Sequence, residues 1–268
     1  MIDAGKHNIL GVQVNVIDYE AAVARIIAAA HAQTGLSVSA LAVHGVMTGA
    51  LDDVHRYRLN HLDLVCPDGQ PVRWALNLMH KASLRDRVYG PNLTLYTCEQ
   101  AAAEGLPIYL YGSHLEVLKA FAHNLRDRYP QLQIAGMQPS KFRQTTFAEK
   151  QEIAAEIKAS GARITLVGLG CPRQEVWAYE YRDALSMPLL AVGAAFDFHA
   201  GLLPQAPKAL QDLGLEWFFR LLQEPQRLWK RYLLLNPHYV WLLSQQMLGL
   251  QAFDPQTAIA PTEELLYG

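Results

Sequence analysis

The chain has 268 residues, of which 51% are hydrophobic and 18% charged, with 23 basic against 25 acidic side chains. This balance excludes a disordered or collagen-like protein and supplies enough apolar material for a substantial core. A net charge of −2 gives no overall attraction for nucleic acid, so any basic partner surface must be local. The length favours one domain of about 200–250 residues with an appendage.

Cysteine usage and the N-terminus indicate the compartment. The three cysteines lie far apart in the sequence, at Cys66, Cys98 and Cys171. Their spacing argues against a disulfide framework and against a cysteine zinc site, and it favours a reducing compartment. Residues 1–10 lack the apolar run of a signal peptide. We therefore expect a cytoplasmic protein.

Short β-rich runs alternate with helical stretches along the chain, a pattern typical of βα units around a mainly parallel sheet. A β-like opening segment at 9–16 precedes an apolar helix over 19–32, for which Asp18 is the expected N-cap. Further strands are expected at 38–43, 62–66, 108–111, 132–135, 164–167 and 189–192. We predict an α/β fold: a mainly parallel sheet flanked by helices, Rossmann-like, with a C-terminal helical appendage.

The helices between these strands begin at recognisable signals. Proline stands in the first turn of three of them, after Gly69-Gln70, after Gly90 and after Cys171. Two others have the spacing of a capping box, at 113–116 and 146–149.

Composition changes near residue 215. Residues 217–250 hold three of the five tryptophans and four basic residues against one acid, Glu224. Residues 251–268 have no Lys or Arg and contain two prolines, which favours a loose tail. We therefore predict an α/β core over 1–214, a basic aromatic helical appendage over 215–250 and a flexible tail over 251–268.

Asp68 stands where functional residues of an open α/β sheet collect, between a buried-strand pattern and a helix start. One interpretation is an N-cap, a role that aspartate performs well. The other is a carboxylate at the edge of the sheet that takes a proton from an acceptor hydroxyl. The spacing alone leaves both open.

Residues 164–175 read as a strand, a turn with Gly168 and Gly170, and a helix. Such a turn lets backbone amides approach an anion, and the helix N-terminus adds partial positive charge. A dinucleotide fingerprint would need a third glycine where the chain has Arg173, which disfavours a nicotinamide cofactor. The alternative is a tight turn that needs glycine only for its geometry.

Two other strand ends carry polar residues. Gly112 and Ser113 follow the strand at 108–111, where helix capping alone would explain the serine. Asp197 lies between two phenylalanines just past an apolar strand. It could bind a ribose or sugar hydroxyl, or only hold the following loop.

Metal chemistry is not expected. The sequence has no Asp-x-Asp element and no H-x-x-x-H or H-E-x-x-H spacing. If a diphosphate leaves during the reaction, arginines and helix N-termini must stabilise its charge instead.

Residues 232–253 form a stretch of 22 residues without formal charge, nominally long enough to span a bilayer. Polar residues at 236–238 and 244–246 interrupt it, so we do not expect it to span. An interfacial helix pair is favoured, with aromatic side chains at headgroup depth and basic ones on lipid phosphates. An amphipathic helix that closes the core, or an oligomer contact, is the alternative, and single-stranded nucleic acid fits a net acidic chain poorly.

Five segments stand in order along the chain: 65–69 (Val-Cys-Pro-Asp-Gly), 87–93 (Arg-Val-Tyr-Gly-Pro-Asn-Leu), 167–175 (Val-Gly-Leu-Gly-Cys-Pro-Arg-Gln-Glu), 193–198 (Gly-Ala-Ala-Phe-Asp-Phe) and 213–227 (Leu-Gly-Leu-Glu-Trp-Phe-Phe-Arg-Leu-Leu-Gln-Glu-Pro-Gln-Arg). Together they resemble the WecG/TagA/CpsF glycosyltransferases, glycosyltransferase family 26. The resemblance runs from about residue 10 to residue 243.

The resemblance implies an inverting, metal-independent transferase that needs no cofactor besides its donor substrate. Such an enzyme moves a sugar from a UDP-sugar to a polyprenyl-diphosphate-linked glycan at the inner face of the cytoplasmic membrane, in cell-surface or exopolysaccharide biosynthesis. We expect no nucleic-acid partner, because the chain is net acidic, and we expect a homo-oligomer off the membrane. A nucleotide-dependent oxidoreductase and a non-catalytic protein that binds lipid-linked glycan are the alternatives.

The resemblance also assigns roles to residues. Asp68 corresponds to the proposed catalytic base, and Arg220 to an appendage arginine that completes the site. The donor-binding residues are expected to be Asn92, Gly112, Ser113, Gly168, Gly170, Arg173, Gln174 and Asp197. The membrane and acceptor residues are expected to be Arg227, Trp229, Lys230 and Arg231.

One position departs from the family pattern. Many members carry Asn-Pro or Asn-Ala after the second strand, whereas this chain has His44 in the segment 43–49. We expect His44 to position a substrate hydroxyl as that asparagine would, or to mark a subgroup that uses another sugar.

Overall fold

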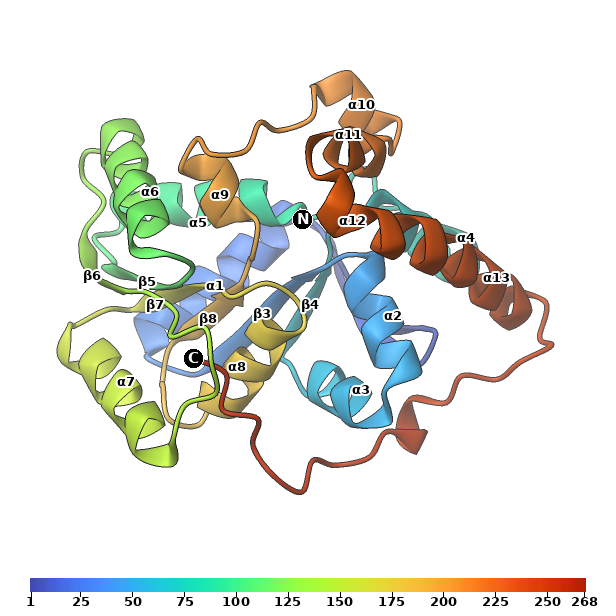
Figure 1. The fold of residues 1–268 in the computed structure, drawn as a ribbon, viewed down its shortest axis with the longest axis horizontal. Helices are drawn as coiled ribbons and strands as arrows, with labels where there is room; N and C mark the ends of the chain where they lie inside the picture. The colour runs from blue at the N-terminus through green and yellow to red at the C-terminus, as the bar shows by residue number, and fades with distance from the viewer.

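Six parallel strands form the central sheet of the computed structural model, which describes residues 1–226, 228–230 and 232–268. The strand order is β4-β3-β8-β7-β5-β6 (Figure 1). Their bounds are β3 Leu36–Leu41, β4 Leu64–Pro67, β5 Ile108–Gly112, β6 Ile134–Gln138, β7 Ile164–Gly168 and β8 Pro188–Ala191. Each lies close to a strand expected from the sequence, and the α/β fold class is confirmed.

The opening segment forms two strands, β1 (Asp3–Ile9) and β2 (Val12–Ile17), paired as an antiparallel hairpin. The β-like segment expected at 9–16 therefore corresponds mainly to β2, whereas most of β1 and the reversal between the two strands were not expected. The chain reverses at Leu10 and Gly11, whose φ angles are +53° and +83°. Two-residue hairpin turns of type I′ have positive φ at both central residues, as found here. The pattern of apolar residues alone does not show this reversal.

Helices cover both faces of the sheet and enclose two cores. One core contains α1 (Tyr19–Ala32), α5 (Gly90–Ala103), α6 (Leu115–Arg128) and α9 (Ala195–His199). The other contains α2 (Val43–Leu51), α3 (Asp53–Asn60), α4 (Gln70–His80), α7 (Phe147–Ala159) and α8 (Arg173–Tyr181). Neighbouring strand residues such as Leu166 and Val167 are assigned to opposite cores, as the two-residue period of a strand requires.

Two of the three predicted side-chain caps are present. Asp18 caps α1 by accepting a hydrogen bond from the Ala21 N–H at 2.9 Å, and Thr146 forms a capping box at the start of α7. The capping box expected at 113–116 is wrong, because His114 is the N-cap of α6 and makes no side-chain cap bond. Ser113 has a φ of +53° and its N–H donates to the Gly168 carbonyl, so this turn is tied to β7 instead.

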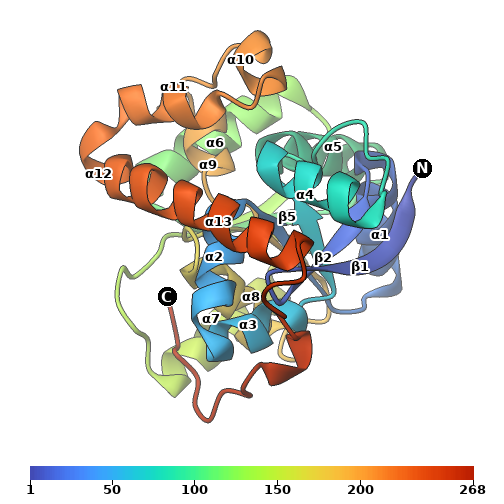
Figure 2. The same cartoon turned by 90° about the vertical axis from the view of Figure 1, so that its right-hand side faces the viewer.

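The appendage lies across one end of the molecule. It comprises α11 (Glu216–Gln223), α12 (Pro225–Lys230), the π-helix η1 (Arg231–Leu235) and α13 (Asn236–Met247), and the short helix α10 (Lys208–Asp212) directly precedes it. The run from α12 to α13 crosses the face formed by α2 and α4 (Figure 2). In the part of the chain that the structure describes, no helix combines the length and the apolar character needed to cross a bilayer.

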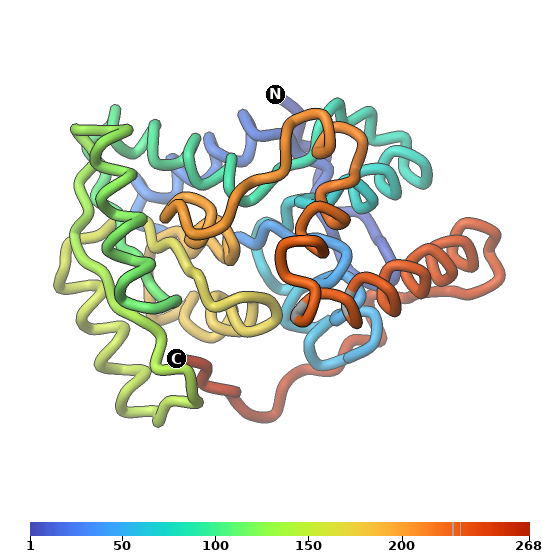
Figure 3. Tube along the Cα trace, turned by 45° about the horizontal axis from the view of Figure 1, so that its top comes forward, coloured from blue at the N-terminus to red at the C-terminus, as the bar shows by residue number. Residues whose placement is uncertain are grey.

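The C-terminal tail, which includes the short 3-10 helix η2 (Pro255–Thr257), returns from α13 along the body toward the segment before α7 (Figure 3). The Glu180 carboxylate accepts hydrogen bonds from the N–H groups of Leu265 and Leu266, at 2.7 and 3.0 Å. Composition predicts a loose tail, whereas these backbone hydrogen bonds attach its end to α8. The division at 214/215 and 250/251 stays a prediction.

Candidate active site

Asp68 lies at the carboxyl edge of the sheet, immediately after β4. Gly69 is the N-cap of α4, and Asp68 does not cap that helix. Its Oδ1 instead accepts a hydrogen bond from the Gly90 N–H at 2.9 Å, which joins the end of β4 to the start of α5. The N-cap interpretation of Asp68 is therefore wrong.

The surroundings of Asp68 raise the pKa of its carboxyl group from 3.8 to about 6. Burial is the largest cause, because a charged carboxylate loses its hydration there. The positive charges of Arg87 and Arg220 and the Gly90 N–H lower the pKa, whereas the negative charge of Glu216 raises it. A carboxyl group with a pKa near 6 is ionised at neutral pH yet basic enough to take up a proton.

Arg87 and Glu216 form a buried ion pair beside Asp68. The Arg87 guanidinium also donates to Gln211 Oε1 at 3.3 Å and lies over the Tyr89 ring, 4.2 Å from its centroid. Glu216 is the first residue of α11, so the appendage contributes an acid to this edge of the sheet. Both residues stand in the motifs at 87–93 and 213–227, but motif membership alone assigned neither of them a role.

The glycine turn after β7 is packed closely on one side and open on the other. A Cβ on Gly112 would lie 2.8 Å from the Gly168 carbonyl carbon, and one on Gly168 would lie 2.7 Å from the Phe196 ring. These two glycines are required for packing. A Cβ on Gly170, whose φ is +76°, would meet nothing within 4 Å, so its backbone borders open space.

Gln174 holds this turn through a side-chain hydrogen bond. Its Oε1 accepts a hydrogen bond from the Gly170 N–H at 3.1 Å, and its Nε2 donates to Glu175 Oε1 at 2.9 Å. The side chain is buried, whereas Arg173, the first residue of α8, is exposed. Pro172 is the N-cap of α8, so it precedes the helix instead of opening it as expected.

The loop after β8 bridges Asp68 and the glycine turn. β3 and β8 separate β4 from β7, which places the two features about 14 Å apart. A Cβ on Gly90, the partner of Asp68, would lie 3.5 Å from the Val192 carbonyl oxygen. The next residue, Gly193, is closer still to Gln174, because a Cβ on Gly193 would lie 2.8 Å from Oε1. A continuous set of contacts therefore joins both ends of this edge.

The structure places the remaining expected site residues as follows. His44 lies in the first turn of α2, directly after β3, and Asp197 lies in α9, after β8. The Arg220 guanidinium lies 5.5 Å from the centroid of the Phe198 ring, which brings α11 against α9. Asn92 lies in the first turn of α5, close enough to Tyr19 to lower the pKa of its hydroxyl, although burial raises that pKa overall.

The residues expected to meet the membrane or the acceptor lie farther along the appendage. Trp229 and Lys230 are exposed on α12. Arg227 and Arg231 lie outside the described residues.

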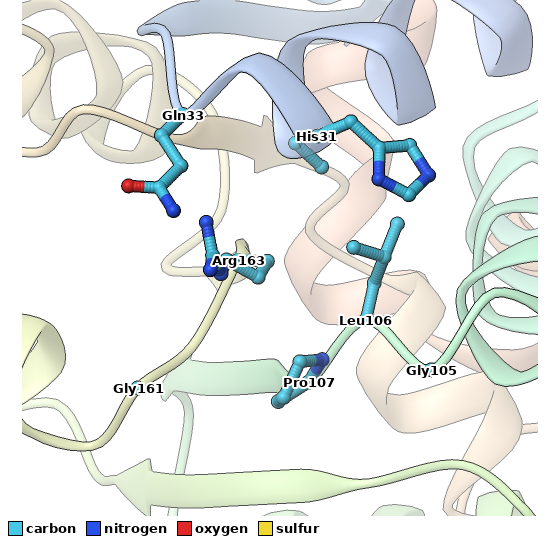
Figure 4. Close-up of a pocket in the computed structure, with 8 residues that line it drawn as sticks. His31, Gln33, Gly105, Leu106, Pro107, Gly161 and Arg163 are labelled. Carbon is cyan, nitrogen blue, oxygen red and sulfur yellow. The ribbon is translucent and has the colours of Figure 1, made fainter.

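Two surface clefts lie apart from Asp68 and the glycine turn. One, of about 360 Å³, is lined by residues that include His31, Gln33 and Arg163, with Gln33 facing Arg163 (Figure 4). It lies at the amino ends of β3, β5 and β7, opposite the carboxyl edge. The other, of about 410 Å³, is lined by residues from α5, α6 and α9.

Within the described residues, no group of three or more His, Cys, Asp and Glu side chains is arranged to hold a metal ion.

Residues 7–252 match the family model of the glycosyl transferase WecG/TagA/CpsF family. The chain belongs to this family. The match spans the sheet, the carboxyl edge with Asp68 and the whole appendage, and it confirms the resemblance seen in the five sequence segments. This glycosyltransferase therefore belongs to the enzymes of cell-surface polysaccharide biosynthesis.

Proposed function

We propose that the chain is an inverting, metal-independent glycosyltransferase that moves a sugar from a UDP-sugar to a polyprenyl-diphosphate-linked glycan. The observation that carries this proposal is the partly buried Asp68 carboxyl, which has a pKa of about 6 and lies at the same edge of the sheet as the open glycine turn. A general base at one end and an anion cradle at the other are the two parts that an inverting transfer needs.

In the proposed reaction, the acceptor hydroxyl attacks the anomeric carbon of the donor sugar. As the new C–O bond forms, the bond from that carbon to the UDP oxygen breaks, and UDP leaves with the bonding electrons. The Asp68 carboxylate takes the hydroxyl proton. The hydrogen bond from the Gly90 N–H holds this carboxylate in place, so little reorganisation is needed during the reaction.

The departing diphosphate needs positive charge, which the protein supplies without a metal in this proposal. The N-terminus of α8 presents backbone N–H groups to an anion, and the open side of Gly170 leaves room for the anion beside that helix. Arg173 is exposed at the start of that helix, and Arg220 lies close enough to lower the pKa of Asp68 by its charge. Guanidinium groups form strong charge-assisted bonds with phosphate.

His44, Asp197, Asn92 and Ser113 are proposed to contact the donor. His44 and Asp197 follow β3 and β8, the two strands between Asp68 and the glycine turn. From these positions, we expect the two side chains to form hydrogen bonds with hydroxyl groups of the donor's sugar or ribose. Ser113 follows β5, where its N–H is bonded to Gly168.

The appendage is proposed to dock on the membrane. Seven apolar side chains are exposed along α12, η1 and α13: Trp229, Leu233, Leu234, Val240, Trp241, Met247 and Leu248. Many are spaced by four or seven residues, so they form one stripe along the helical run. Leu228 and Tyr239 are buried against the body, and the Tyr239 hydroxyl donates to the Pro71 carbonyl at 3.2 Å.

Such a stripe beside the exposed Lys230 suits an anionic lipid surface. The enzyme would then act as a peripheral protein at the inner face of the cytoplasmic membrane, next to its lipid-linked acceptor. Off the membrane, a homo-oligomer that covers the stripe is part of the proposal.

A donor panel tests the proposed function. UDP release is measured with UDP-linked glucose, N-acetylmannosamine, N-acetylmannosaminuronate and related sugars, each with and without a short lipid-diphosphate acceptor. Acceptor-dependent release with at least one donor is expected. If none of the donors releases UDP while lipid-linked glycan still binds, the chain is a binding protein and the proposal is wrong.

A further inference from the structure

The most unusual charge arrangement outside the proposed chemistry is the buried pair of Arg87 and Glu216. Each residue is less than a tenth exposed. A buried ion pair contributes little net stability, because desolvation of both charges offsets their attraction. Its place beside Asp68 therefore calls for an explanation other than stability.

The ion pair with Glu216 positions the Arg87 guanidinium. Among the described residues, Glu216 is the carboxylate that lies within 4.0 Å of the Arg87 guanidinium. The Asp68 carboxylate has no basic nitrogen of a described residue within that distance, and it accepts its hydrogen bond from the Gly90 N–H. Arg87 is nevertheless close enough to be the strongest positive influence on Asp68. Without the carboxylate of Glu216, the guanidinium would be left to neutralise Asp68.

The same pair fastens the appendage to the core. The side chain of Gln211, in α10, accepts a hydrogen bond from Arg87. The Gln211 backbone carbonyl accepts one from the side-chain Nε2 of Gln70 at 3.5 Å. Gly214, with a φ of +71°, packs against the Trp74 ring on α4. The segment that enters α11 therefore contacts α4, which follows Asp68, and Arg87, and α11 carries Arg220 to the same edge.

We propose that Glu216 is a positioning residue of the transfer reaction. It holds the Arg87 guanidinium off the Asp68 carboxylate and fixes α11, with Arg220, beside the site. This inference rests on the proposed function. It adds a second role for the appendage. Besides basic groups for the diphosphate, the appendage contributes Glu216, which leaves the Asp68 carboxylate free to take up a proton.

Several other groups act on Asp68 and must be kept constant in a test. They are Arg87 before α5, the Gly90 N–H in α5, Arg220 in α11, and the neutral side chains of Tyr19, Cys66 and Tyr89. Glu216→Gln removes one charge and keeps the shape of the side chain. Asp212→Asn is the matched control, since it removes an exposed carboxylate four residues earlier, on α10.

The test compares pH profiles of kcat/KM for UDP release by the full chain and its variants. Glu216→Gln should move the acid limb about one pH unit lower and reduce kcat by about tenfold or more, because the uncompensated Arg87 makes Asp68 a weaker base. KM for the donor should stay within a few-fold. Asp212→Asn should match the wild type, and Glu216→Asp, which keeps the charge, should retain the wild-type acid limb.

The inference would be overturned if Glu216→Gln had the same pH profile as the wild type. It would also be overturned if the acid limb of Glu216→Asp shifted as far as that of Glu216→Gln. Hydrogen exchange gives a readout that does not depend on activity: amides of residues 206–224 should exchange faster in Glu216→Gln than in the wild type, and equal rates would also overturn it. A wild type that releases UDP from no donor would instead refute the proposed function, and the exchange comparison would still test the fastening.

Discussion

Asp68 is subject to two opposing effects. Burial disfavours its charged form, while Arg87, Arg220 and the Gly90 N–H favour it. Burial prevails, and the carboxyl keeps a pKa of about 6. At this value the group is ionised in neutral solution and still retains the basicity that a fully paired aspartate loses.

The first prediction concerns catalysis by this group. Asp68→Asn should reduce transfer by about 10²–10⁴-fold, because an amide cannot take up the hydroxyl proton. UDP binding, measured by calorimetry, should stay within a few-fold of wild type. In the wild type, kcat/KM should fall as the pH drops below about 6, where Asp68 becomes protonated. Normal turnover by Asp68→Asn would remove this residue from the mechanism.

The second prediction concerns stability. A carboxyl group with a raised pKa binds more protons in the folded state, so its penalty on folding develops as the pH rises from 3.8 to about 6 and is complete above that range. Asp68→Asn removes this penalty. The unfolding free energy of the variant, relative to wild type, should therefore rise between pH 4 and pH 7 by on the order of 2 kcal/mol.

Urea titrations at several pH values measure this difference. A difference that does not change with pH would show that the carboxyl is not buried in its charged form.

At the scale of elements, the glycine turn after β7 combines required packing with an open side. Gly112 and Gly168 let β5, β7 and α9 approach one another, whereas Gly170 leaves space where an anion could lie. Packing therefore depends on Gly112 and Gly168, which end β5 and β7, whereas ligand access depends on Gly170.

The third prediction separates these roles. Gly170→Ala should cost about 1 kcal/mol of stability because a side chain is strained at positive φ, and it should weaken UDP binding by tenfold or more. Gly161→Ala is the control, since its φ of +78° and open surroundings are matched at the opposite end of β7. It should show a similar stability loss with unchanged UDP affinity. Equal UDP affinity in both variants would contradict the anion cradle.

The fourth prediction concerns the apolar stripe of the appendage. Replacing Leu234 and Trp241, which are 64% and 62% exposed, by serine should lower binding to anionic vesicles by several-fold. Stability should change by no more than about 0.5 kcal/mol, because neither side chain is buried. A control with Leu51 and Ile259 replaced by serine removes equally exposed apolar groups elsewhere. Sedimentation with vesicles that is the same for all proteins would count against membrane docking.

At the scale of the whole molecule, one sheet with a core on each face holds both parts of the site on a rigid edge. The appendage and the tail then wrap around this body, and they are fastened by Glu216, Tyr239 and Glu180. Deleting the appendage would expose buried residues, so point substitutions are the cleaner experiments.

The fifth prediction concerns the whole reaction. Because the proposed charge stabilisation comes from arginines and backbone amides, activity should persist in excess EDTA. UDP release in EDTA and with added Mg²⁺ or Mn²⁺ measures this directly. Strict dependence on an added divalent ion would contradict a metal-independent mechanism.

Much of the fold could be predicted because its signals are local. Short apolar runs rich in β-forming residues mark strands, and a cap such as Thr146 with Glu149 needs only four residues. The box at 113–116 failed because a contact with a distant strand, through the Gly168 carbonyl, decided the conformation of Ser113. The hairpin reversal at Leu10 and the bonds of the tail were missed for similar reasons.

The sequence by itself determined the α/β class, the family and the position of Asp68 at a strand end. Only the tertiary structure decided that Gly90 holds this carboxyl, that Arg87 pairs with Glu216 across 129 residues, and that the loop after β8 joins Asp68 to the glycine turn. The physical reason is range. Propensities and caps act over a few residues, whereas the pairing of buried charges depends on which surfaces the fold brings into contact.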